Sequence, residues 1–114
     1  MKIISRSISL AEITKMAENR FGNLVKAVVD IAKKVMVVDG ELHADEEALL
    51  LENNSRQTSL WGINLYPGKY GSEEFIEFDS MINLRPSQNN LSRGVESQDI
   101  QNKIRQIVNQ LVTK

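Results

Sequence analysis

The single histidine of the chain, His43, lies in the segment ELHAD at residues 41–45. If this segment is extended, Glu41, His43 and Asp45 project to the same side, because side chains alternate along a strand. One imidazole with two carboxylates suits a divalent transition metal, and a carboxylate can also orient an imidazole that acts as a general base. A solvated strand end with scattered polar groups explains the same residues, and we favour it because a lone histidine is not a motif.

Four polar residues alternate along a predicted strand at residues 75–84: Glu77, Asp79, Asn83 and Arg85. Paired carboxylates two residues apart can bind a hard cation or divide acid and base roles. Arg85 could hold a phosphate or a carboxylate through two hydrogen bonds, or neutralise Asp79. The water-facing side of a one-sided antiparallel sheet is also expected to be polar, and we favour this second interpretation.

The segment WGINLYP at residues 61–67 contains a third candidate. Gly62 interrupts an apolar run, which predicts a bulge or the close approach of another group. Asn64 and Tyr66 would share a face with Gly62 and form a shallow floor for a ligand. The opposite face carries residues that we expect in the core: Trp61, Ile63 and Leu65.

No sequence frame of a serine or lysine nucleophile or of a phosphate-binding loop is present. Basic residues are dispersed, and Lys33-Lys34 is their only adjacent pair, so nucleic acid is not an expected partner. The 14 basic and 15 acidic residues nearly cancel, which also argues against binding to anionic lipid. The chain has no cysteine, which excludes disulfides, thiol nucleophiles and iron–sulfur clusters, and we expect no cofactor.

The 114 residues are enough for one domain spanning residues 1–114. The longest apolar runs have four residues, so we expect neither a secretory signal nor a membrane span, and a cytoplasmic protein is the default. The first strand is expected at residues 2–4. Ser9 and Glu12 form the pattern of a capping box before a helix that ends at Gly22. A last helix is expected from about Gln98 to Val112, with Ser97 as its cap.

The middle of the chain fits more than one assignment of secondary structure. Apolar residues between Leu24 and Met36 are spaced as one helical stripe, so we predict a second helix over residues 24–38. The many β-branched residues there favour two strands instead. Strands are then expected at residues 49–52, 56–66 and 75–84, the first two joined by a turn at residues 53–55. A short helix over residues 45–52 is the alternative to the first of these strands.

This layout predicts an α+β fold, in which a small antiparallel sheet carries three helices on one face in the order β-α-α-β-β-β-α. Three segments together resemble a small prokaryotic family that is catalogued only as a domain of unknown function: GELHADEEALLLENNSRQTSLWGINLYP, FIEFDSMINLRPSQNN and QDIQNKIRQIV. The resemblance covers nearly the whole chain. It implies a cytoplasmic prokaryotic protein and supplies no activity, ligand or catalytic residue.

The leading hypothesis is a small, soluble, non-enzymatic binding or interaction domain, monomeric or homodimeric, that meets a small ligand or a protein partner through its polar sheet face. That face would carry Glu41, His43, Asp45, Glu77, Asp79 and Arg85. One rival is a metal-dependent hydrolase that uses His43 and the carboxylates of Asp45, Glu77 and Asp79. Another is one member of a regulatory protein pair.

Overall fold

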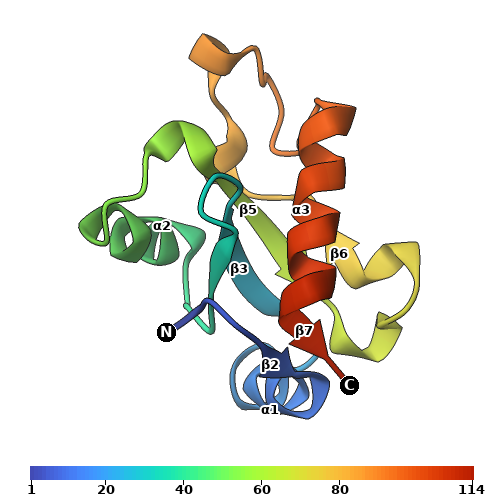
Figure 1. The fold of residues 1–114 in the computed structure, drawn as a ribbon. Coiled ribbons are helices and arrows are strands. Elements are labelled where there is room, and N and C mark those ends of the chain that lie inside the picture. The colour runs from blue at the N-terminus through green and yellow to red at the C-terminus, as the bar shows by residue number, and fades with distance from the viewer.

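The computed structural model describes all 114 residues and is built on a five-stranded sheet in which every neighbouring pair of strands is antiparallel. In sheet order, the strands are β1 (Lys2–Ile4), β4 (Val35–Val38), β3 (Val25–Asp30), β5 (Leu60–Leu65) and β6 (Ile76–Glu77). A short parallel pair, β2 (Ile8–Ser9) and β7 (Val112–Thr113), joins segments near the two ends of the chain. The helices are α1 (Leu10–Arg20), α2 (His43–Glu52) and α3 (Gln98–Leu111). The predicted α+β class with an antiparallel sheet is confirmed (Figure 1).

Both faces of the sheet are covered. Alternate residues of β3 and β5 point to opposite sides, as in any strand. One side joins α1 and α3 in a cluster of 20 buried residues, which includes Val29, Trp61 and Ile104. The other side contributes Val28 and Leu60, together with β4, to a small cluster with α2. The structure therefore places α2 opposite α1 and α3, whereas we expected all three helices on one face.

The helix predicted over residues 24–38 is wrong, and the alternative of two strands is correct. β3 lies between β4 and β5 and is buried on both faces, so its apolar residues form a continuous run that also fits a helical stripe. The turn between the strands is held by Asp30, whose carboxylate accepts the backbone N–H groups of Ala32 and Lys33, both at 2.9 Å. Lys34 completes this turn with a left-handed backbone, φ 59°.

The strand predicted at residues 49–52 is also wrong, because these residues end helix α2. Acidic residues in its first turn, Asp45 and Glu46, favour a helix at this position. Asn54, with φ 72°, follows the helix in the left-handed conformation that asparagine tolerates. His43 is the first residue of α2, so the alternation that we expected for residues 41–45 does not apply.

The strand predicted at residues 75–84 is correct only for its first part, because β6 ends at Glu77. Beyond it, Ser80 caps a 3₁₀ turn by accepting the N–H of Ile82. Asn83 then replaces a paired strand at the edge of β5: its side chain accepts from Gly62 N and donates to Gly62 O. Alternating polarity in this stretch reflects a loop that packs on the sheet edge.

The predicted starts of the first and last helices are confirmed. The Ser9 hydroxyl accepts the N–H of Glu12, and the Ser97 hydroxyl accepts the N–H of Ile100. The Glu12 carboxylate pairs with Lys2 at 2.7 Å and makes no return bond to Ser9, so only half of the capping box forms. None of the three helices has the length and the apolar composition that a membrane-crossing segment requires.

Candidate functional site

A row of polar side chains crosses the sheet on the α2 side, near the end of β5. In strand register, Asn64 lies between Lys26 of β3 and Glu77 of β6. The Asn64 amide donates to Oε1 of Glu77 at 2.8 Å, and the Tyr66 hydroxyl donates to the same oxygen at 3.0 Å. The other carboxylate oxygen of Glu77 accepts no hydrogen bond within the chain. Asn64 and Tyr66 therefore share a face and both bind the Glu77 carboxylate, whereas the gap expected beside Gly62 is filled by Ser80 and Asn83.

His43 reaches the same end of β5 from the first turn of α2. Its Nε2 lies 2.7 Å from the carbonyl oxygen of Ile63. A carbonyl only accepts, so Nε2 carries the proton of this bond. Burial lowers the pKa of His43 below its ordinary value of 6.5, and the positive charge of Lys26 lowers it further, against the opposing effect of the Ile63 hydrogen bond. The imidazole is therefore neutral at pH 7, and its Nδ1 is an acceptor without a partner in the chain.

Asp79 adds a second carboxylate beside this row. Its backbone oxygen receives a long hydrogen bond of 3.4 Å from the Asn64 amide. Its side chain pairs with Arg93 at 2.7 Å, and both side chains are about half exposed. The negative charge of Asp79 raises the pKa of His43, whereas Arg93 lowers it, so both groups lie within electrostatic reach of the imidazole. We call His43, Asn64, Tyr66, Glu77 and Asp79 the polar edge.

The remaining candidates do not join the polar edge. Glu41 and Asp45 are exposed, and neither forms a hydrogen bond with His43. The general-base arrangement expected from a neighbouring carboxylate is therefore absent, because a backbone carbonyl orients the imidazole instead. No group of three or more His, Asp or Glu side chains gathers closely enough to hold a metal ion. The metal candidates His43, Asp45 and Asp79 therefore form no shared ligand set.

Asn83 and Arg85 face inward and hold the chain together. Asn83 has no exposed surface, and besides Gly62 its amide donates to the Arg93 carbonyl at 2.9 Å. The Arg85 guanidinium donates to the carbonyl oxygens of Ile82, Gln57 and Leu60 and stacks over the Trp61 ring at 4.2 Å. Burial lowers the pKa of Arg85. Both side chains secure the long segment after β6.

Tyr66 separates two hollows in the surface. The first has a volume of about 420 Å³ and lies between the end of α1 and the turn after β5. The second, of about 360 Å³, is lined by Tyr66, Lys69, Glu73, Glu74, Ile76 and Glu77. Burial is the main cause that raises the pKa of Tyr66, and its hydrogen bond to Glu77 adds to this effect, so the phenol remains a donor. The second hollow carries three carboxylates against one ammonium group.

Lys26, Glu46 and Arg93 are part of this region and were not among the predicted residues. Glu46 is fully buried, and burial raises its pKa to about 9, so its carboxyl group is neutral at pH 7. Helical spacing could have found it, because Glu46 follows His43 by one turn and precedes Leu50 by another on the buried face of α2. Lys26 could have been found from the two-strand alternative, in which it alternates with buried valines.

The polar edge also contains an acceptor that the chain leaves unused. Asn64 is only 8% exposed, and its side-chain oxygen Oδ1 is buried without a hydrogen-bond partner. The orientation of this amide is set by the Glu77 carboxylate, which must face the NH₂ group. Nδ1 of His43 and the second carboxylate oxygens of Glu77 and Asp79 are further acceptors of the polar edge without a partner in the chain.

Comparison with protein families identifies the family of this chain. The model of a family described as "Protein of unknown function (DUF5674)" matches residues 2–111, which is nearly the whole chain. No curated protein and no solved structure matches the chain. The resemblance found in the sequence, to a family of unknown function, is confirmed.

Proposed function

Because the chain belongs to the DUF5674 family of proteins of unknown function, its own residues must indicate its function, and we propose a small non-enzymatic binding domain. Its ligand is a positively charged, hydrogen-bond-donating group, an ammonium or a guanidinium, on a protein partner. That group binds at the polar edge. The observation that carries the proposal is the Glu77 carboxylate, which keeps one oxygen free of hydrogen bonds in a hollow lined by three carboxylates.

Unpaired acceptors favour a ligand that donates. A buried polar atom without a hydrogen bond is costly, and nearly all such atoms in proteins find a partner. Asn64 Oδ1 is such a buried atom, whereas Nδ1 of His43 is not among the buried unpaired atoms and can accept a hydrogen bond from a ligand. A cationic donor would satisfy both the hydrogen-bonding capacity and the charge of Glu77.

The charge of the second hollow points to the same class of ligand. Glu73, Glu74 and Glu77 line it together with a single lysine, Lys69. The Lys69 ammonium lies 5.3 Å from the centre of the Tyr66 ring, which is already a cation–π contact on this surface. A guanidinium or ammonium from a partner would therefore meet negative charge and an aromatic face. Such a surface suits a basic side chain of a protein, including the other member of a regulatory pair.

We place this binding in the cytoplasm of a prokaryote, the setting that the sequence resemblance implies. The complete lack of cysteine fits a reducing compartment, in which disulfides do not contribute to stability. Both a monomer and a homodimer are compatible with the proposal, because each chain carries its own polar edge.

Amide shifts in an NMR titration test the proposal directly. The probe is N-acetyl-arginine amide, and N-acetyl-citrulline amide is its neutral counterpart of the same shape. We expect the arginine probe to shift the amides of residues 64–66 and 73–79 and to lose its effect at high salt, because exposed charges are screened. Inorganic phosphate, a nucleotide and Mg²⁺ serve as comparison ligands.

Glu77→Gln is the informative variant, because a glutamine oxygen can still accept from Asn64 and Tyr66 while the charge is lost. We expect it to weaken binding of the arginine probe about tenfold. Glu41→Gln is the matched control: it removes an exposed carboxylate outside the polar edge and should leave binding unchanged. Equal responses to arginine and citrulline, or shifts only with phosphate, would contradict a cationic ligand.

A further inference from the structure

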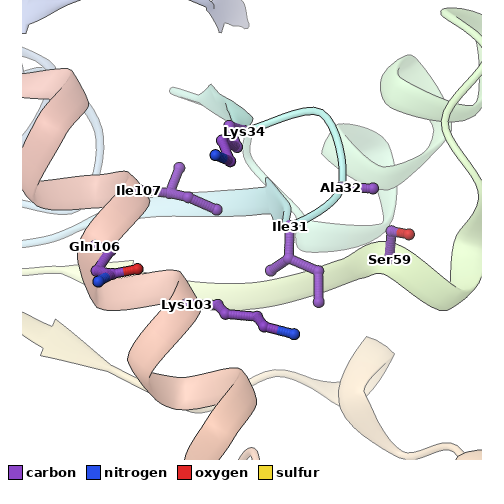
Figure 2. Close-up of a pocket in the computed structure, with 7 residues that line it drawn as sticks. All are labelled: Ile31, Ala32, Lys34, Ser59, Lys103, Gln106 and Ile107. Carbon is purple, nitrogen blue, oxygen red and sulfur yellow. The ribbon is translucent and has the colours of Figure 1, made fainter.

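A third hollow lies at the end of β3 and β5 that is opposite to the polar edge. It has a volume of about 420 Å³ and separates the β3–β4 turn from α3. We call it the hairpin cavity. Its lining residues are Ile31, Ala32, Lys34, Ser59, Lys103, Gln106 and Ile107. Figure 2 shows the side chains of Lys103 and Ile107 extending from α3 towards the turn that carries Ile31.

The polar side chains of the hairpin cavity are almost free of internal partners. The side chains of Lys34, Ser59 and Gln106 form no hydrogen bond or ion pair within the chain. Lys103 has one ion pair, at 3.4 Å, with Asp99 one turn earlier on the helix surface, whose side chain is 80% exposed. Such an exposed pair is weak and easily exchanged. The lining contains two ammonium groups and no carboxylate, so it is set to receive negative charge.

The backbone of Lys34 provides an independent observation. Four residues other than glycine have positive φ: Lys34, Asp39, Asn54 and Asn89. Aspartate and asparagine tolerate this left-handed conformation, but lysine carries the full steric cost of its Cβ. A residue held in a disfavoured conformation is a reason to look for a use of its side chain. Here that side chain lines the cavity.

The apolar part of the lining limits the kind of anion. Ile107 is almost fully buried and Ile31 is half-buried, and both border the cavity between the two lysines. An inorganic anion would leave this apolar surface in contact with water. An anion with a hydrocarbon or ring body would cover it and gain from its burial. Small-molecule sites combine an apolar lining with a few placed polar groups in this way, typically at about 300–1,000 Å³.

We propose that the hairpin cavity binds a small organic anion, a carboxylate or phosphate on an apolar body. We place the anionic group at the ammonium groups of Lys34 and Lys103, the two positive charges of the lining. The apolar body rests on the two isoleucines. This site is separate from the polar edge and takes ligands of the opposite charge.

An NMR titration with hexyl phosphate and with hexanoate tests the site, because each joins one anionic group to a short hydrocarbon chain. We expect saturable shifts at the amides of residues 31–34, 59 and 103–107 with at least one of the two. Inorganic phosphate and hexanol, the separate halves of the first probe, should bind more weakly than hexyl phosphate. If neither amphipathic anion produces saturable shifts at these amides, the proposal fails.

Adjacent lysines supply a matched pair of variants. Lys34→Gln and Lys103→Gln should each weaken binding about tenfold. Lys33→Gln removes the same charge from the same turn, but the Lys33 ammonium donates to the Asn53 carbonyl and does not line the cavity, so we expect wild-type affinity. A loss in Lys33→Gln equal to that in Lys34→Gln would mean non-specific attraction and would overturn the proposal.

Lys34→Gly separates loss of binding from loss of folding. Glycine adopts a φ of 59° without strain, so this variant should keep or raise the melting temperature while it weakens binding as much as Lys34→Gln does. Unchanged affinity in a folded Lys34→Gly protein would show that the lysine side chain does not contact the anion. The result is independent of the proposed function, because the probes of the polar edge are cations.

Discussion

Glu46 belongs to α2 and has no exposed surface. Its carboxyl group faces the segment that follows β4. Its Oε2 accepts the N–H of Gly40 at 2.9 Å, and Oε1 has no partner. Position 40 needs a glycine, because a Cβ there would overlap the Glu46 side chain. Burial raises the pKa of Glu46 to about 9, with smaller opposing effects from the Gly40 hydrogen bond and Lys26.

This pKa makes the stability of the protein depend on pH. The folded pKa of about 9 lies above the ordinary 4.5, so the folded state binds an extra proton between these values. The stabilising contribution is complete below about pH 4.5 and is lost as pH rises towards 9, by about 1.4 kcal/mol per pH unit. Glu46→Gln keeps a neutral group of the same shape. We expect it to exceed the wild type in free energy of unfolding at pH 8 and to match it at pH 5.

Urea unfolding at several pH values between 5 and 9 measures this difference. Glu41→Gln is the control, because it removes a carboxyl from an exposed position nearby, and it should keep the wild-type pH dependence. A constant difference between Glu46→Gln and the wild type across this range would show that the buried carboxyl does not titrate as we expect.

His43 makes the stability of the protein depend on pH in the opposite direction. Its pKa is lowered, chiefly by burial, so the unfolded chain binds the proton more readily than the folded protein. The contribution of His43 to stability is therefore complete above about pH 6.5 and is lost as pH falls below it. Because the chain has one histidine, its imidazole proton resonance can be followed without ambiguity.

We expect the midpoint of that NMR titration to lie below 6.5 in the folded protein and near 6.5 in urea. Lys26→Gln should raise the midpoint of the folded protein, because the positive charge of Lys26 opposes protonation. A folded midpoint at or above 6.5 would argue that the imidazole is solvated and that Nδ1 is not held as an unpaired acceptor.

The sequence predicted the neighbours of a site residue only where that residue lies in or next to a regular strand. Asn64 lies in β5, where alternation holds, and Tyr66 follows the last residue of this strand on the same side, since both side chains bind Glu77. Glu77 joined them because it is the last residue of β6. Asn83 and Arg85 lie beyond that strand, where alternation has no meaning, and their side chains replace backbone partners inside the protein. Residue type alone does not distinguish a polar group that binds a ligand from one that binds the chain.

At the scale of elements, Gly62 shows how a strand accommodates the loop that covers it. The sequence predicted a bulge or a close approach, and the structure shows the close approach with unbroken register. A Cβ at position 62 would lie 2.5 Å from the Ser80 Cβ and 2.6 Å from its hydroxyl oxygen. Asn83 holds this contact through two hydrogen bonds to the Gly62 backbone.

Gly62→Ala should therefore destabilise the protein by about 1–3 kcal/mol, the usual cost of an extra methyl group in a packed interior. Denaturant unfolding measures it. Gly68→Ala is the matched control, since no atom lies within 4 Å of a Cβ at position 68, and its stability should stay within about 0.5 kcal/mol of wild type. Equal stability of the two variants would mean that the loop can move away from β5 at no cost.

The two errors in predicting elements have different physical causes. Residues 24–38 read as a helix because a central strand buried on both faces has no polar face to reveal its period of two. Residues 49–52 were predicted as a strand, with a helix over residues 45–52 as the alternative, because α2 buries only a narrow face and His43 and Glu46 occupy two of its inward positions. The ends of α1 and α3 were predicted well because their capping is local to a few residues. Burial on two faces depends on partners that are distant in sequence.

At the scale of the whole molecule, the two buried clusters share one sheet. Val28 and Val29 are neighbours in β3, yet the first belongs to the α2 side and the second to the large core. Trp61, in β5, is buried in the large core and is the only tryptophan, so its fluorescence reports on the side opposite α2. If the sheet couples both sides, a change on the α2 side must alter the unfolding reported by Trp61.

Leu50→Ala tests this coupling. Leu50 is almost fully buried in the small cluster, so the variant should lose about 2–5 kcal/mol of stability. We expect the midpoints from Trp61 fluorescence and from far-ultraviolet circular dichroism to fall together, as in a two-state domain. Leu51→Ala, at an exposed neighbouring position, should leave both midpoints near those of the wild type. If circular dichroism detected the loss of α2 before the fluorescence changed, the chain would behave as a sheet core with a separately unfolding helix.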